Sequence, residues 1–123
     1  MRLIAGVDRP AKGSDPANFV LPATTQRLLG ADAGQAVRLY RVAFGEGART
    51  YWHAHDDAQL LYGLSGRCVV VDRSGSELTL GPGDLVVIEP GEEHWHGAAP
   101  GGPGEHLAIN LGVETRWLES SSS

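Results

Sequence analysis

The sequence predicts an all-β domain, either a sandwich or a barrel, with the jelly roll among the options. Short apolar and β-branched runs alternate with turn residues, and 17 of the 123 residues are glycine. Almost no segment shows the helical period. One domain is expected, because about 100–150 residues is the usual size of a single domain.

Each expected strand is an apolar run that stops at turn residues. The first four strands are expected at 35–44, closed by Gly45-Glu46-Gly47, at 49–55, at 58–64, closed by Ser65-Gly66, and at 68–71, closed by Arg73-Ser74-Gly75-Ser76. The last four are expected at 77–80, closed by Gly81-Pro82-Gly83-Asp84, at 85–88, closed by Pro90-Gly91, at 94–98, followed by the Gly/Pro-rich stretch 100–104, and at 105–111. Residues 1–18 are expected to form an N-terminal arm, 19–118 the domain and 119–123 a disordered tail.

The composition excludes several classes of function. The chain has 10 Lys and Arg against 15 Asp and Glu, a formal net charge of −5, which disfavours nucleic acid and anionic membranes as partners. No apolar run reaches the roughly 18 residues of a membrane span, and no signal peptide is evident. Cys68 is the single cysteine and suits a reducing compartment. We therefore expect a cytoplasmic protein with a small-molecule substrate.

All five histidines lie between residues 53 and 106. Side chains two apart in a strand point to one face, so His53 and His55 can reach one point, and His94 and His96 repeat the pattern. Gln59 follows a turn and is expected opposite the first pair. Imidazole is the commonest protein ligand of first-row divalent ions, and an amide oxygen is an acceptable partner. A single His-x-His is weak evidence, and a β-sandwich with structural histidines remains the alternative.

Two motifs resemble those of the cupin family. The first motif is matched by Gly47, His53, His55, Gln59 and Gly66, and the second by Gly83, Gly91 and His94. The resemblance covers residues 35–111 and implies a double-stranded β-helix, the jelly-roll barrel of cupins, with a metal held by His53, His55, Gln59 and His94. Cupins often pair through their sheets, which implies a homodimer or homotetramer.

The chain is more similar to one branch of the family. The segments around Trp52-His53, His94-Trp95-His96 and His106 resemble small bacterial cupins, some of them manganese-dependent hydroxynitrile lyases and others associated with carboxymuconolactone decarboxylase-like proteins. The chain departs from the second motif at Glu89 and Ala98. Asn110 stands where those lyases carry Gln, which shortens a pocket group.

Gln59 replaces the glutamate that is commonest among cupin ligands. Three imidazoles and one amide are all neutral, so a divalent ion would keep its full charge, which favours Lewis-acid chemistry over oxygen activation. Manganese is the expected ion, with Fe, Zn, Ni and Co as alternatives. The expected activity is that of a lyase on a small hydroxy or carbonyl compound. The alternatives are a dioxygenase or isomerase of an enolisable substrate, and a binding protein without activity.

The remaining polar residues of these segments supply the expected chemistry. His106 is the candidate general acid or base, because imidazole titrates near neutral pH. His106 and Asn110 share a parity on their expected strand, so both side chains should point to the same face. Thr50, His96 and Asn110 are the candidate substrate-binding residues.

Overall fold

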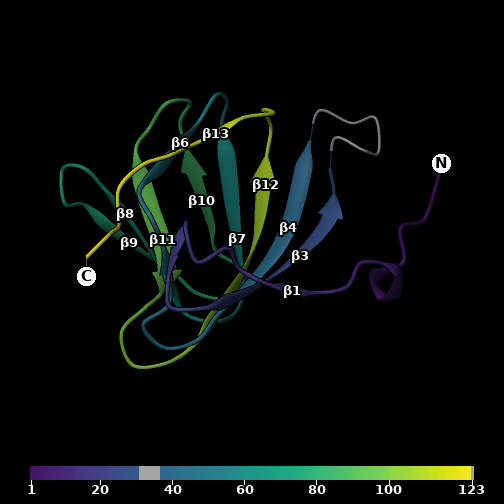
Figure 1. Ribbon diagram of the computed structural model, residues 1–123, viewed down its shortest axis with the longest axis horizontal. Helices are drawn as coiled ribbons and strands as arrows, with labels where there is room; N and C mark the ends of the chain where they lie inside the picture. The colour runs from purple at the N-terminus through teal and green to yellow at the C-terminus, as the bar shows by residue number, and fades with distance from the viewer. Residues whose placement is uncertain (31–36, 123) are drawn as a thin grey trace.

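The computed structural model describes residues 1–30 and 37–122, and these residues form two antiparallel sheets (Figure 1). The first sheet has the strand order β1-β3-β4-β12-β7-β10, and the second has the order β13-β6-β11-β5-β2, with β8 pairing both β11 and β9. The strands of the first sheet are β1 (Lys12–Gly13), β3 (Ala23–Leu29), β4 (Arg38–Phe44), β7 (Gln59–Gly66), β10 (Leu85–Ile88) and β12 (Gly104–Asn110). Those of the second are β2 (Phe19–Val20), β5 (Arg49–Thr50), β6 (His53–His55), β8 (Cys68–Asp72), β9 (Glu77–Leu80), β11 (His94–Ala98) and β13 (Thr115–Trp117).

The predicted all-β architecture is confirmed. Within the described residues the helical content is one short 3₁₀ turn, η1 (Gly6–Asp8), on the arm that extends away from the sheets in Figure 1. No helix in the described part of the chain has the length and apolar character needed to cross a membrane.

Strand β12 lies at the centre of the first sheet, between β4 and β7. Its side chains alternate strictly, so that His106, Ala108 and Asn110 are buried while the residues between them are half-buried. Alternation of this kind directs every second side chain to the interior of the barrel. The register pairs Asn110 with Arg38 on one side and with Gln59 on the other, which places three polar side chains in one row across β4, β12 and β7.

Strand β11 is buried along its whole length and joins the shorter strands of the second sheet. It pairs with β8 over five residues, with β5 at Gly97 and with β6 at His94. The pair His94 and His53 is therefore fixed by the backbone ladder. Sheet pairing brings the two histidine motifs together although they are far apart in sequence.

The main apolar core lies between the two sheets. It includes Val42 and Phe44 of β4, Leu61 of β7, Leu80 of β9 and Ile88 of β10. Burying a side chain of this size contributes roughly 1.5–3 kcal/mol relative to leaving it in water. The ring of Phe44 also contacts the rings of His96 and His106, with centroids 5.9 and 5.5 Å apart. The apolar core is thus in direct contact with two of the histidine rings, through Phe44.

The described strands differ from the expected ones at 49–55 and by four additional strands. The strand expected at 49–55 is two strands, β5 and β6, because Tyr51 and Trp52 donate their backbone N–H groups to Asn18 and Glu119 instead. Strands β1, β2, β3 and β13 were not expected. Residues 35 and 36 of the expected strand 35–44 lie outside the described residues.

The end of the chain differs from the disordered tail that the sequence suggested. Ser121 is buried, and its hydroxyl donates to the carbonyl oxygen of Thr50 at 2.6 Å. The guanidinium of Arg49 donates to the Ser121 carbonyl. The chain end is thus attached to β5, a strand that carries a candidate site residue. The domain boundaries at 19 and 118 stay a prediction.

Gly97 is expected to tolerate no side chain. A Cβ atom there would meet the carbonyl oxygen of Ala48 and lie 2.7 Å from Cα of Arg49, so β5 would have to move away from β11. We expect Gly97→Ala to lower the free energy of unfolding by about 1–3 kcal/mol, the usual cost of overpacking. Urea unfolding measures this cost. Gly13→Ala is the control, because a Cβ on Gly13 meets nothing within 4 Å.

Candidate metal centre

Three imidazoles meet where β6 and β11 pair. The ring centroid of His53 lies 4.3 Å from that of His94 and 5.0 Å from that of His55, and His55 lies 5.5 Å from His94. All three side chains are buried. The expectation that His53 and His55 share one face of a strand is met, because both rings lie beside the ring of His94.

Hydrogen bonds orient these rings. Nδ1 of His53 lies 2.8 Å from the Tyr51 carbonyl, and Nδ1 of His94 lies 2.9 Å from the Glu92 carbonyl. A carbonyl oxygen only accepts, so each Nδ1 carries the proton and each Nε2 carries a lone pair. Metal-binding histidines are typically held in this way, by a hydrogen bond from the nitrogen that does not bind the metal.

Gln59 presents its oxygen to the same point. Its amide nitrogen donates to Oδ1 of Asn110 at 2.7 Å, and its Oε1 lies 3.1 Å from Nε2 of His94. With Nδ1 of His94 protonated, Nε2 and Oε1 are two electron-pair donors that face each other. A shared cation makes this arrangement favourable, and the separation suits two neighbouring ligands with bonds of about 2.0–2.2 Å. The residues present therefore fit a divalent metal ion.

His55 adds a second observation that fits a metal. Its Nδ1 lies 3.1 Å from Oγ1 of Thr115, while its Nε2 is buried and has no hydrogen-bond partner among the described residues. A buried polar atom without a partner is costly and rare in folded proteins. A metal ion would supply the missing partner.

A second histidine set overlaps with the expected ligands. His53, His94 and His96 each offer a nitrogen, and these three atoms lie within 4.8 Å of one another. The sequence pointed to His55 and Gln59 instead of His96. Nδ1 of His96 is hydrogen-bonded to Nε2 of His106 at 3.0 Å, as Nδ1 of His55 is to Thr115, so each ring keeps its Nε2 for a metal, and the Nε2 of His55 is buried without a partner among the described residues. Three buried histidines able to hold a metal are thus present. Which residues complete the set of metal ligands is part of the proposed function.

His96 and His106 form a buried pair behind the first three rings. Their shared hydrogen bond holds one proton, so one ring donates and the other accepts. His96 lines the pocket described below, whereas His106 is fully buried and is not among its lining residues. Thr50 accepts a hydrogen bond from the backbone N–H of His96 at 3.2 Å. Thr50 and Asn110 both line the pocket with His96.

Burial keeps all five imidazoles neutral. Desolvation is the largest cause in each case, and it lowers the pKa of His55 and of His106 to about 4. The pKa values of His53 and His96 lie well below the ordinary value, and the pKa of His94 is also lowered. The neighbouring His94 and Arg38 lower the pKa of His55 further. A neutral imidazole is the form that binds a metal ion.

The metal-free protein is expected to lose stability as the pH falls from 6.5 towards 4. Unfolded histidines take up protons near pH 6.5, while the folded pKa of His106 is about 4, so the unfolded chain binds more protons in this range. Each such histidine lowers the free energy of unfolding by up to about 1.4 kcal/mol per pH unit. Urea unfolding at pH 7.5, 6 and 5 measures the slope, and His106→Asn should reduce it. An unchanged free energy between pH 7.5 and 5 would contradict this assignment.

A pocket of about 400 Å³ leads to the imidazoles from outside the barrel. Its inner end includes His53, His55, Gln59, His96 and Asn110. Its walls include Phe19, Arg38, Tyr40, Val42 and Trp117. Sequence reasoning missed all five wall residues. Arg38, Tyr40 and Val42 lie two residues apart on one strand, so the strand period could have indicated that all three face the interior. Phe19 and Trp117 come from two short strands that no sequence pattern marked.

The described strands form an antiparallel barrel, and the barrel encloses neutral imidazoles able to hold a metal. These two features place the chain in the class of small β-barrel proteins that can hold a metal inside the barrel. Comparison with known proteins gives the family. A model of the cupin domain matches residues 40–110. The chain belongs to the cupin family, and the resemblance noted in its motifs is confirmed.

Individual relatives agree with this assignment. The (R)-mandelonitrile lyase of Granulicella tundricola is 37% identical over 121 residues, covering 94% of this chain and 92% of that protein. A cupin-like protein from Thermotoga maritima is 31% identical with a TM-score of 0.88, covering 94% of this chain and 89% of that one. A polyketide cyclase from Streptomyces resistomycificus shares the fold with a TM-score of 0.78 at 22% identity, covering 99% of this chain and 88% of that one.

Proposed function

We propose that the protein is a metal-dependent lyase that acts on a small hydroxy or carbonyl compound, in the manner of a hydroxynitrile lyase. One observation carries the proposal: the donors that meet where β6, β7 and β11 converge are all uncharged, with Nε2 of His94 facing Oε1 of Gln59 at 3.1 Å. The 37% identity to the (R)-mandelonitrile lyase of Granulicella tundricola supports the same class of reaction.

We assign the metal ligands to His53, His55, Gln59 and His94. When bound there, a divalent ion would act as a Lewis acid on a substrate oxygen, because no ligand charge offsets its own. Imidazole and amide ligands suit manganese, our first expectation, and also Fe, Zn, Ni and Co.

The protein's own groups then bind the substrate and move its proton. Thr50 and Asn110 offer a hydroxyl and an amide to the substrate at the pocket wall. The hydrogen bond between His96 and His106 holds a single proton, so that Nε2 of His96 can take up a substrate proton while its Nδ1–H donates to Nε2 of His106. His106 is the proposed acid or base, and it reaches the pocket through His96.

Purified protein supplied with manganese is expected to cleave mandelonitrile into benzaldehyde and hydrogen cyanide. Benzaldehyde absorbance gives the rate, and elemental analysis of protein made without a histidine tag gives the metal content. We expect about one equivalent of metal and a rate that disappears on treatment with a chelator and returns with manganese. Metal at full occupancy without cleavage of any cyanohydrin or aldol substrate would contradict the lyase proposal.

The same preparation tests the alternatives. Oxygen uptake by the iron form would favour a dioxygenase, and isomerisation of an enolisable compound without bond cleavage would favour an isomerase. Ligand binding without turnover would favour a protein without activity. A homodimer or homotetramer remains our proposal for the assembly, with light scattering as its test, and the cytoplasmic location stays a prediction.

A further inference from the structure

Arg38 lies in the wall of the pocket with part of its guanidinium unsatisfied. Its Nε donates to the Gly112 carbonyl at 3.2 Å, while its Nη2 is buried and has no hydrogen-bond partner among the described residues. A buried donor left unpaired on a charged group is costly, and in a pocket a bound ligand can supply its partner.

The register of the first sheet places Arg38 near the proposed metal ligands. Arg38 on β4 is opposite Asn110 on β12, and Asn110 is opposite Gln59 on β7. Neighbouring strands lie about 4.8 Å apart, so two steps separate the backbones of Arg38 and Gln59 by about 10 Å. An extended arginine side chain covers much of that span. A small substrate can therefore reach Gln59 and the guanidinium at once.

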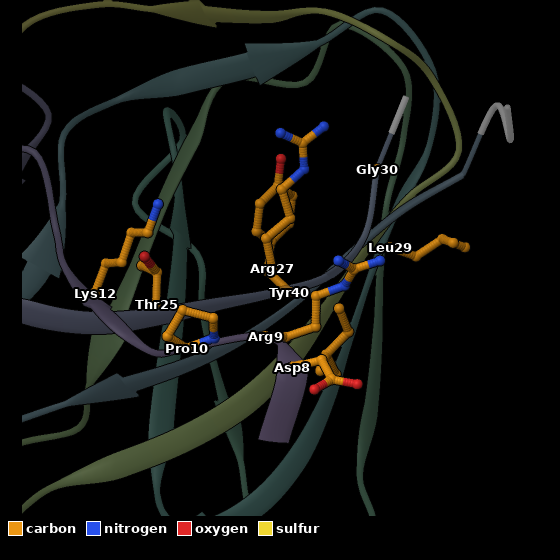
Figure 2. A pocket seen from close by; sticks show the side chains of 10 residues that line it. Asp8, Arg9, Pro10, Lys12, Thr25, Arg27, Leu29, Gly30 and Tyr40 are labelled. Carbon is orange, nitrogen blue, oxygen red and sulfur yellow. The ribbon is translucent and has the colours of Figure 1, made fainter. Parts of the chain in front are cut away.

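The charge around the pocket favours an anion. Arg38 is the charged residue among the described lining residues; the carboxylate of Asp56, whose pKa is lowered mainly by hydrogen bonds from backbone N–H groups and also by Arg38, lies outside that lining. Thr25 and Tyr40 also line an adjoining hollow, whose charged residues are the basic Arg9, Lys12 and Arg27 and the acidic Asp8 (Figure 2). Basic side chains along an approach raise the local concentration of anions.

We propose that the substrate carries a carboxylate, and that Arg38 binds this group through Nη2. A guanidinium matches a carboxylate in shape and charge, which makes the hydrogen bond stronger than one to a neutral group. Phe19, Tyr40 and Trp117 give the pocket an apolar and aromatic wall. The substrate class is accordingly a small hydroxy or oxo acid with an apolar substituent. This inference rests on the proposed function only in taking this pocket as the substrate site.

Mandelate and mandelamide form a matched pair of probes, because they share the phenyl and hydroxyl groups and differ in charge. We expect calorimetry to show that the protein binds mandelate at least about tenfold more tightly than mandelamide, both with manganese and after its removal by a chelator. The metal-free measurement matters because a carboxylate can also bind an ion directly.

Substitution of Arg38 then tests the assignment. We expect Arg38→Met to reduce the ratio of the two affinities to about one, and Arg38→Lys to retain part of it. Loss of the bond to Gly112 alone would weaken both probes equally and leave the ratio unchanged. Arg41→Met is the control, because Arg41 lies on the same strand with its side chain half exposed and paired with Glu105, and it should keep the ratio.

Each outcome decides the proposal separately from the lyase activity. Equal affinities in the unmodified protein, no detectable binding of mandelate at millimolar concentration, or an unchanged ratio in Arg38→Met would overturn the carboxylate assignment. A preserved preference for mandelate without any cleavage of mandelonitrile would support the assignment of Arg38 and count against the hydroxynitrile reaction.

Discussion

Replacing His94 with alanine is expected to remove the metal and to reduce kcat/KM at least about a thousandfold. His94 provides Nε2 beside Oε1 of Gln59, and its ring lies within 5.5 Å of the rings of His53 and His55. Its removal takes away the donor that links β11 to the ligands on β6 and β7. A Lewis acid contributes several kcal/mol to a transition state, and about 1.4 kcal/mol corresponds to a factor of ten. Elemental analysis and steady-state kinetics with mandelonitrile measure both losses.

Two further variants separate the overlapping ligand sets. If His55 is a ligand, His55→Ala loses metal as His94→Ala does, while His96→Ala keeps it. The opposite pattern would assign the site to His53, His94 and His96, the three histidines whose nitrogens lie within 4.8 Å of one another. Glu93→Gln serves as the control. Glu93 directly precedes β11, and its carboxylate pairs with Arg73 and Arg116 at the surface. An activity of His94→Ala close to that of the unmodified protein would contradict the metal-dependent mechanism.

Replacing His106 with alanine is expected to lower kcat/KM by about 10²–10⁴-fold and to leave the metal content unchanged. This range is the usual contribution of a positioned general acid or base. Nε2 of His106 is hydrogen-bonded to Nδ1 of His96, so the substitution leaves His96 without the partner that receives or supplies its proton. The pH dependence of kcat/KM should also change shape, which a purely structural loss would not cause.

His96→Ala identifies the ring that meets the substrate. Because His96 lines the pocket and His106 does not, this variant should lose at least as much activity as His106→Ala. The double variant should lose little more than either single one, since the two rings act as a unit. Activity of His106→Ala within threefold of the unmodified protein, at full metal content, would exclude the proposed proton path.

Much of the fold followed from local patterns. Strands β9, β10 and β11 have the bounds that the sequence suggested, because each is a short run between turns marked by Gly or Pro. Strand β3 was missed because Thr24, Thr25, Gln26 and Arg27 interrupt its apolar residues. Strand β13 has three residues, and its pairing with β6 forms it. Pairing between distant segments overrides local preference, and no single-sequence pattern reports it.

The site was predictable where the two-residue period of a strand decides which way a side chain points. The shared face of His53 and His55 followed from the two-residue period of a strand, and the burial of His106 with Asn110 from the same rule. The hydrogen bond between His96 and His106 depends on how two sheets pack, which a local period cannot give. The same holds for Arg38, whose position relative to Gln59 comes from the register of three strands.

The central claim is that neutral donors from β6, β7 and β11 share one divalent ion inside the barrel. Anomalous diffraction from crystals of the manganese-loaded protein tests it directly, because the signal locates the ion among its ligands. We expect a single peak bounded by Nε2 of His53, His55 and His94 and by Oε1 of Gln59. No peak at that point, or a peak bound by His96 with His55 turned away, would contradict the account.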